Sequence, residues 1–281
     1  MDSNEKTLVI LTPAFPANET EENWVHSLQL FLHSVKKQLP GIRINVLSFI
    51  YPHKMSNYQW HGVKVFSFDG MKYRKYRRPL LWRKIWKKLS EINKQQEIGA
   101  ILSIWCGECA LVGKYFGKNH SIKFSAWICG QDARKKNKIV KLIRPRPNEL
   151  IAKSDFLADE FYRNHHIRPA YLIPNGIDVS LFGQSGERNI DILGAGSLSF
   201  LKQYDIFLEV IAGLKTKMPG IKAVLCGDGE HADGIKKMRE DFSLQQTLSL
   251  PGMLTITETI GLMQRAKILL HPSAYEGFSM A

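Results

Sequence analysis

Near the end of the chain, a carboxylate and a glycine stand side by side. Glu276 and Gly277 belong to residues 271–279, which follow a short apolar run (267–270) typical of a buried strand. A carboxylate accepts hydrogen bonds from hydroxyl groups, and a glycine lets a ligand come close to the backbone. We expect a helix to begin here, with its first backbone N–H groups forming a site for an anion. These groups belong to Phe278, Ser279 and Met280. A strand-to-helix turn with a capping serine and no ligand is the alternative interpretation.

Glycine-containing loops also follow predicted strands earlier in this half of the chain. Residues 193–202 read Leu-Gly-Ala-Gly-Ser-Leu-Ser-Phe-Leu-Lys, and residues 225–230 read Leu-Cys-Gly-Asp-Gly-Glu. Between the two halves of the chain, residues 172–178 read Leu-Ile-Pro-Asn-Gly-Ile-Asp. Because the carboxyl ends of parallel strands gather at a topological switch point, we expect Lys202 and Glu276 to converge on one cleft between the two halves of the chain.

Taken in order, these stretches resemble the motifs of the large fourth family of retaining glycosyltransferases, the glycosyl transferases of group 1, which have the GT-B fold. Pro-Ser-x-Tyr-Glu-Gly-Phe is the signature of that family, and the resemblance covers nearly the whole chain. It implies transfer of a sugar from a UDP- or GDP-sugar to a glycan or lipid-linked acceptor, with retention, in envelope polysaccharide biosynthesis. It also implies no metal and no cofactor, because cationic side chains and a helix N-terminus stabilise the departing diphosphate.

The resemblance assigns roles to individual residues. Lys202 matches the lysine that contacts the donor diphosphate, and Glu276 matches the first of two glutamates eight apart, the one near the transferred sugar. Ser197 stands where the family usually has an arginine, so less positive charge would face the diphosphate. Asp132 ends Cys129-Gly-Gln-Asp132, in which a cysteine replaces the histidine of the pattern His-Gly-x-Asp. The predicted catalytic residues are Glu276 and Asp132; the predicted donor-binding residues are Lys202, Ser197, Gly277, Phe278, Ser279, Gly227 and Gly229.

The second glutamate of the family pattern would fall beyond Ala281. In the family this carboxylate holds the ribose, and later helices complete the lobe and cross back to the N-terminal lobe. The resemblance therefore predicts a C-terminally truncated enzyme, and we expect residues 1–281 to be catalytically silent and less stable than an extended form. A silent binding or scaffold protein is the alternative function.

Cysteines give a competing interpretation. They stand at positions 106, 109, 129 and 226, too few and too scattered for a disulfide framework. Trp105-Cys-Gly-Glu-Cys109 follows a strand and opens a helix, the setting of a thioredoxin-type redox pair. Because no partner strand with a candidate cis-proline follows, we expect Cys106 and Cys109 to be structural, with Glu108 facing the cleft. A thiol-disulfide oxidoreductase remains a less favoured alternative, and no second Cys or His pair has zinc-ligand spacing.

The net charge of +13 attracts polyanions, and much of it gathers in residues 72–88, where no acidic residue occurs. Pro79 should start a helix in this segment. Its inward face would hold Leu81, Ile85 and Leu89, and its outward face Lys84, Lys87 and Lys88. A solvated basic face is one interpretation. The other is docking on an anionic membrane surface, with Tyr73, Tyr76, Trp82 and Trp86 at the interface. Nucleic-acid binding is disfavoured because no recognised module for it is present.

Short apolar runs alternate with helical patterns along the chain. Strands are expected at residues 8–11, 43–49, 63–68, 100–104, 123–127, 150–152, 190–194, 222–226, 247–250 and 267–270. Helices are expected near residues 24–35, 81–89, 204–217, 234–242 and 257–265. This alternation predicts an α/β fold with two Rossmann-like doubly wound lobes, the second incomplete.

The predicted domains are an N-terminal acceptor-side lobe (1–172), a linker (173–188) and a C-terminal nucleotide-sugar-binding lobe (189–281). No apolar run approaches the ~20 residues that span a bilayer, and the polar start does not resemble a signal peptide. We therefore expect a cytoplasmic protein, at most peripheral on the inner face of the membrane.

Overall fold

The computed structural model describes residues 6–21, 25–73, 75–183 and 186–281. It divides into two compact units, Met1–Gly176 and Ile177–Ala281, and this division falls inside the predicted linker. Each unit has its own sheet with helices on both faces, so the predicted α/β fold class with two Rossmann-like lobes is confirmed. Trp24 of the first predicted helix and Arg74 of the basic segment lie outside the described residues.

The N-terminal unit is built on an eight-stranded sheet of order β3-β4-β2-β1-β5-β6-β7-β8. Its strands are parallel apart from β3, which pairs with β4 in antiparallel fashion. In chain order they are β1 (Thr7–Ala14), β2 (Arg43–Tyr51), β3 (Met55–Trp60), β4 (Val63–Phe68), β5 (Ile98–Ile104), β6 (Lys123–Trp127), β7 (Leu150–Ala152) and β8 (Tyr171–Leu172).

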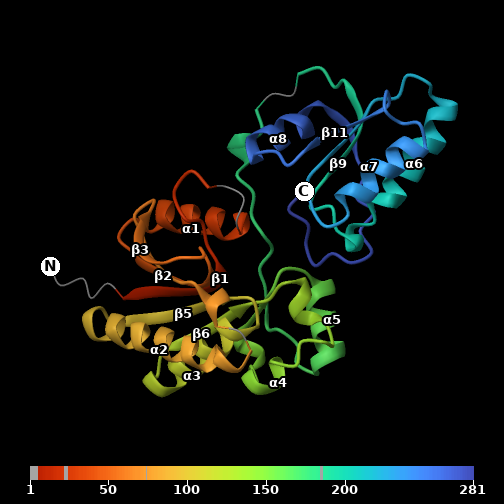
Figure 1. Cartoon of the computed structure of the whole chain (residues 1–281). Coiled ribbons are helices and arrows are strands. Elements are labelled where there is room, and N and C mark those ends of the chain that lie inside the picture. The colour runs from red at the N-terminus through yellow and green to blue at the C-terminus, as the bar shows by residue number, and fades with distance from the viewer. Residues whose placement is uncertain (1–5, 22–24, 74, 184–185) are drawn as a thin grey trace. The chain divides into compact units, whose positions relative to one another are not determined.

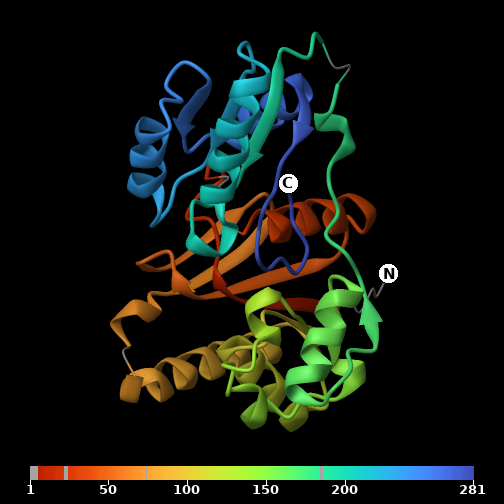
Figure 2. The same cartoon turned by 90° about the vertical axis from the view of Figure 1, so that its right-hand side faces the viewer.

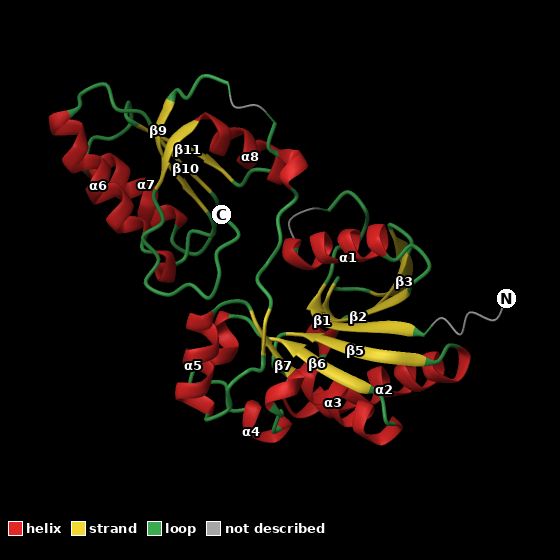
Figure 3. Ribbon diagram, turned by 180° about the vertical axis from the view of Figure 1, so that it is seen from behind, coloured by secondary structure: helices red, strands yellow, loops and turns green. Residues whose placement is uncertain are grey.

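Helices cover both faces of this sheet, as Figures 1 and 3 show. They are α1 (His26–Gln38), α2 (Arg78–Gln95), α3 (Glu108–His120), α4 (Val140–Ile143) and α5 (Asp155–His165). On one face α1 buries Leu28 and Leu32 against the strands. On the other face α2, α3 and α5 share a core, and α2 contributes Leu81, Ile85 and Leu89 as its sequence pattern predicted.

The C-terminal unit has a four-stranded parallel sheet of order β11-β10-β9-β12. Its strands are β9 (Ile190–Ala195), β10 (Ala223–Cys226), β11 (Leu248–Gly252) and β12 (Ala266–Leu269). Its helices are α6 (Tyr204–Lys217), α7 (Ala232–Asp241) and α8 (Ile256–Arg265). One core lies under α6 and α7, and a smaller one lies on the opposite face under α8 (Figure 1).

The strand order of each sheet reverses at one place, and this decides where a ligand can bind. In the N-terminal unit β1 lies between β2 and β5, so the chain winds outward in both directions from β1 and β5. In the C-terminal unit the same reversal lies between β9 and β12. At such a switch point the loops after the two strands part and leave a crevice at their carboxyl ends.

Candidate functional site

The structure brings Lys202 and Glu276 together at the β9–β12 switch point of the C-terminal unit. Lys202 ends a short 3₁₀ helix (Phe200–Lys202) after β9, and Glu276 lies in the loop after β12. The Lys202 ammonium group donates a hydrogen bond to Oε2 of Glu276 and forms an ion pair with it. The two loops are also joined through the backbone, because Ala274 N–H donates to the Leu201 carbonyl at 3.0 Å. The expected convergence is confirmed within this unit.

Glu276 is ionised at neutral pH. Burial would raise its pKa, but the hydrogen bond and charge of Lys202 and the imidazole of His271 hold the pKa below its usual value. His271 Nε2 lies 3.4 Å from Glu276 Oε2 and 2.9 Å from the hydroxyl of Ser273. The site therefore presents a cation suited to a diphosphate beside a carboxylate suited to sugar hydroxyls, and the two neutralise each other.

Gly227 and Gly229 bring the loop after β10 against the loop after β9. Leu198 N–H donates to the Asp228 carbonyl at 2.9 Å, and Gly196 N–H donates to the Cys226 carbonyl at 3.1 Å. A Cβ atom at Gly227 would lie 1.8 Å from the Gly196 carbonyl oxygen, and one at Gly229 would lie 2.6 Å from that of Leu198. Both glycines have positive φ as well. They hold the loop that carries Lys202 and the exposed Ser197, which adds a structural role to the predicted donor contact.

The expected helix after Glu276 is not present. Residues 271–281 contain no helix, and Figure 2 shows this dark-blue segment as an extended loop. The predicted anion site on the N–H groups of Phe278, Ser279 and Met280 is therefore not formed as a helix start. Ser279 instead accepts a hydrogen bond from Ala281 N–H through its hydroxyl, at 3.2 Å.

Asp132 lies in the N-terminal unit, in a 3₁₀ helix (Gly130–Ala133), and only 6% of the residue is exposed. Its Oδ2 accepts the Cys129 N–H at 2.8 Å, so the carboxyl group closes its own turn. Burial raises the pKa of Asp132 to about 6, although hydrogen bonds from Cys129 and Cys106 oppose the shift. The catalytic role of Asp132 remains a prediction, and the structure shows a carboxyl group occupied with its own backbone.

Comparison with known proteins bears on the C-terminal unit first. Residues 182–281 match the model of the family described as glycosyl transferases group 1. The match lies within the C-terminal unit and covers less than half of the chain. Over 148 residues, half of this chain, it is 25% identical to the gpi3 subunit of phosphatidylinositol N-acetylglucosaminyltransferase from Schizosaccharomyces pombe. The chain spans about a third of the length of that relative, 32%.

Solved structures share the fold of the whole chain. The lipopolysaccharide outer core galactosyltransferase WaaB, in its apo form, superposes with a TM-score of 0.67 at 16% identity, over 98% of this chain and 76% of WaaB. HepE of Anabaena, solved with UDP and glucose, also gives 0.67 at 16% identity, over 95% of this chain and 74% of HepE. These likenesses agree with the expected fold class, two Rossmann-like lobes of the GT-B type.

Replacing Asp132 by asparagine separates a structural role from a catalytic one. The folded-state pKa of about 6 exceeds the usual 3.8, so the folded protein binds the extra proton and loses stability as pH rises from about 4 to 6. At pH 7 the buried, ionised Asp132 therefore lowers the free energy of unfolding by on the order of 3 kcal/mol. Asp132→Asn keeps a hydrogen-bond acceptor, so we expect this pH dependence to vanish from chemical denaturation curves. A variant with unchanged pH dependence but no activity would contradict the structural role.

Cys106 and Cys109 are buried and free and Cys129 is half-buried and free, which argues against the oxidoreductase alternative. Burial raises the pKa of Cys106 and of Cys109 far above their usual range, and it raises the pKa of Cys129 to about 12. A redox pair needs the opposite shift in at least its first thiol. Among the described residues, no group of three or more His, Cys, Asp and Glu side chains could hold a metal ion.

We expect Cys106 and Cys109 to resist iodoacetamide at pH 8 in the native protein and to react fully in denaturant, because only the thiolate is nucleophilic. Mass spectrometry of quenched time points would measure both. The protein should also fail to reduce insulin, with or without Cys106→Ser. Insulin reduction that Cys106→Ser abolishes would restore the oxidoreductase interpretation.

Of the four aromatic side chains of residues 72–88 expected at a membrane interface, Tyr76 is exposed and the other three are half-buried. Tyr73, Trp82 and Trp86 pack against the core, and Trp86 stacks edge-on against Phe116 with ring centroids 5.0 Å apart. Glu108 does not project freely, because its carboxylate forms a bidentate pair with Arg78 and accepts the Trp82 indole N–H at 3.2 Å. The exposed apolar side chains of this surface are Tyr76, Leu80 and Met71.

Glu21, which was not among the predicted site residues, lies in the loop after β1 of the N-terminal unit. Its Oε2 accepts the Ala17 N–H at 2.6 Å, and its Oε1 accepts the hydroxyl of Tyr51 from the end of β2. The polar stretch after β1 carries no motif, and the tyrosine that fixes the carboxylate is distant in sequence, so no local signal pointed to it.

Within the described residues, no helix is long and apolar enough to cross a membrane.

Proposed function

We propose that this chain transfers a sugar from a nucleotide-sugar donor to a glycan or lipid-linked acceptor. The observation that carries the proposal is the contact between Lys202 and Glu276 at the switch point of the unit that matches the group 1 family. The carboxyl ends of β9 and β12 are where an α/β sheet binds its ligand, and both side chains reach that place from different strands.

In this proposal each side chain has one task. The Lys202 ammonium group neutralises the diphosphate as its bond to the sugar breaks, without a metal ion. Glu276 accepts hydrogen bonds from the sugar hydroxyls and orients the ring. The acceptor attacks from the face that the diphosphate leaves, so the configuration of the sugar is retained. Ser197 supplies no second cation, and Lys202 therefore carries more of the charge stabilisation.

Names among the similar proteins support the classes of substrate. HepE was solved with UDP and glucose, which favours a UDP-sugar donor over a GDP-sugar. WaaB is described as acting on lipopolysaccharide, and the fission yeast relative as acting on phosphatidylinositol. A lipid-linked glycan of the cell envelope is thus our proposed acceptor, and its assembly on the inner face of the membrane our proposed process.

Calorimetric titration with UDP, GDP and inorganic phosphate tests the donor assignment. We expect UDP to bind with the highest affinity and phosphate not to bind measurably. Hydrolysis or transfer of the sugar from the matching nucleotide-sugar, followed by NMR, would then show the activity and the retained configuration. UDP binding without any turnover would favour the silent binding protein, and no binding of either nucleotide would contradict the donor site.

We further propose weak docking of α2 and the preceding turn on anionic membranes. Lys84 and Lys87 are exposed, as are Tyr76 and Leu80 beside them. Each Lys near an anionic surface contributes about 1 kcal/mol, so Lys84→Glu with Lys87→Glu should lower binding to phosphatidylserine vesicles by about tenfold or more. Co-sedimentation at low and high salt measures this. Lys236→Glu with Lys237→Glu, on α7, is the matched charge control, and an equal loss in the control would contradict the docking surface.

A further inference from the structure

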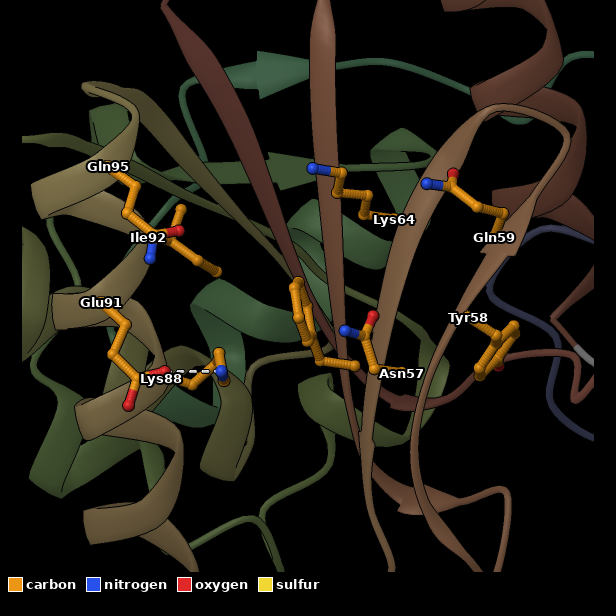
Figure 4. Close-up of a pocket in the computed structure, with 9 residues that line it drawn as sticks. Asn57, Tyr58, Gln59, Lys64, Lys88, Glu91, Ile92 and Gln95 are labelled. Atoms are coloured by element: carbon orange, nitrogen blue, oxygen red, sulfur yellow. Dashed lines mark hydrogen bonds and ion pairs between the residues drawn. The ribbon is translucent and has the colours of Figure 1, made fainter.

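A polar groove lies in the N-terminal unit between the β3–β4 hairpin and the second half of α2 (Figure 4). Its volume is about 380 Å³, within the ~300–1,000 Å³ typical of small-molecule sites. Asn57, Gln59 and Lys64 line it from the hairpin, and Glu91, Ile92 and Gln95 line it from α2.

The groove exists because β3 is the edge strand of the sheet. On this face Asn57 pairs across strands with Phe66, and Gln59 pairs with Lys64, while α2 packs over the neighbouring part of the sheet. Trp60 on the other face is buried and the Tyr58 side chain points away from the groove, where its hydroxyl donates to the Pro16 carbonyl. The outer face of β3 is therefore polar and open, although both faces of a doubly wound sheet are normally covered.

The groove holds polar groups whose hydrogen-bonding capacity is not used within the described chain. No side-chain hydrogen bond or ion pair to another described residue involves the carboxamides of Asn57, Gln59 and Gln95 or the ammonium group of Lys64. Lys88 is different: it pairs with Glu91 at 2.5 Å, and its ammonium group lies 5.1 Å from the centre of the Phe66 ring. Once this pair is set aside, the uncompensated charge in the groove is the single positive charge of Lys64.

We propose that this groove binds an anionic saccharide, one that carries a carboxylate or phosphate group. Carboxamides both donate and accept, which suits neighbouring sugar hydroxyls, since each hydroxyl does the same. Lys64 supplies the partner for the anionic group, and Ile92 with the ring of Phe66 supplies an apolar floor for the C–H groups of a sugar ring. Nothing in this assignment depends on the proposed transfer reaction.

The groove is separate from the crevice at the carboxyl ends of β1 and β5. Lys64 stands at the start of β4 and Gln95 at the end of α2, directly before β5 begins, so both mark the amino edge of the sheet. A saccharide in the groove would be held apart from that crevice. Binding there can thus be measured without turnover, and nucleotide need not be present.

The test is a chemical-shift titration of ¹⁵N-labelled protein with tetragalacturonate (anionic), maltotetraose (neutral) and inorganic phosphate. We expect millimolar binding of tetragalacturonate that shifts the side-chain NH₂ signals of Asn57, Gln59 and Gln95, with weaker effects of maltotetraose and none of phosphate. Lys64→Gln should weaken tetragalacturonate binding about fivefold or more, whereas Lys94→Gln, which makes the same charge change on α2 outside the groove, should not.

Three outcomes would overturn the proposal. Equal binding of maltotetraose and tetragalacturonate would remove the anionic requirement, and equal shifts with phosphate would show that charge alone is recognised. Unchanged affinity in Lys64→Gln, in a protein whose other signals match the wild type, would place the ligand elsewhere. If the protein fails to bind UDP, the donor site is contradicted, but the result of the saccharide titration is unaffected.

Discussion

In a form of the protein that turns over nucleotide-sugars, Lys202→Ala is expected to lower kcat/KM by about 100-fold or more. Removing one group that stabilises developing negative charge typically costs 10²–10³ in rate, and here no second cation at position 197 can take over. Turnover of UDP-sugars by wild type and variant, measured by release of UDP, gives the ratio. Lys202→Arg should recover part of the loss, because its guanidinium keeps the charge but with a different geometry.

Lys236→Ala is the matched control for this prediction. Lys236 lies in the same unit, on α7, and forms an exposed ion pair with Asp233 at 3.0 Å. Exposed pairs of this kind contribute ~0–1 kcal/mol, so neither turnover nor folding should change measurably. Wild-type turnover in Lys202→Ala, or an equal loss in Lys236→Ala, would remove Lys202 from the donor site.

Glu276→Gln is expected to change donor binding and sugar transfer in opposite directions. Without ligand, the Lys202 ammonium group is occupied by the Glu276 carboxylate, and a diphosphate must displace that carboxylate to bind. With the charge removed, UDP should bind about two- to fivefold more tightly, in line with the ~0–1 kcal/mol of a partly exposed pair. Sugar transfer should instead fall by about 100-fold, because the carboxylate that orients the sugar is lost.

Calorimetry with UDP and a transfer assay on the same preparation would measure the two effects of Glu276→Gln. Glu240→Gln, an exposed carboxylate on α7, controls for the general loss of negative charge. If UDP binds more weakly to Glu276→Gln than to wild type, the ion pair does not compete with the diphosphate. If Glu240→Gln shows the same gain in affinity, the gain is a long-range charge effect.

The spacing of apolar residues predicted most of the buried helices and strands, because burial leaves a regular apolar pattern in the sequence. The bounds of β4, β6, β7 and α6 match the expected ones, since each is an apolar run or an amphipathic repeat between polar turns. β3 was not predicted because it is an edge strand with one polar face. Its signal in the sequence is limited to the alternation of Tyr58 and Trp60 with polar residues. The two-residue turn at His61 and Gly62, both with positive φ, was the remaining local indication of a hairpin.

Family motifs singled out Lys202 and Glu276, but no property of the sequence revealed that they bind each other without a ligand. Their contact depends on strand order, since β9 and β12 are neighbours in the sheet although 70 residues lie between the end of β9 and the start of β12. The burial of Asp132 and the engagement of Glu108 by Arg78 are likewise tertiary effects. For both residues the sequence suggested a free carboxylate, but tertiary packing buries Asp132 and pairs Glu108 with Arg78.

The lack of a side chain at Gly227 and at Gly229 shapes the site around Lys202. Where Gly227 and Gly229 meet the carbonyls of Gly196 and Leu198, the space left for a substituent is smaller than a methyl group. Gly227 and Gly229, which offer a ligand no side chain, therefore cannot gain one unless the loop that carries Lys202 moves. Ser197, exposed on the same loop, can vary without disturbing that contact. A new side chain at Ser197 would therefore change what this loop presents to a ligand while the two glycines keep Lys202 in place.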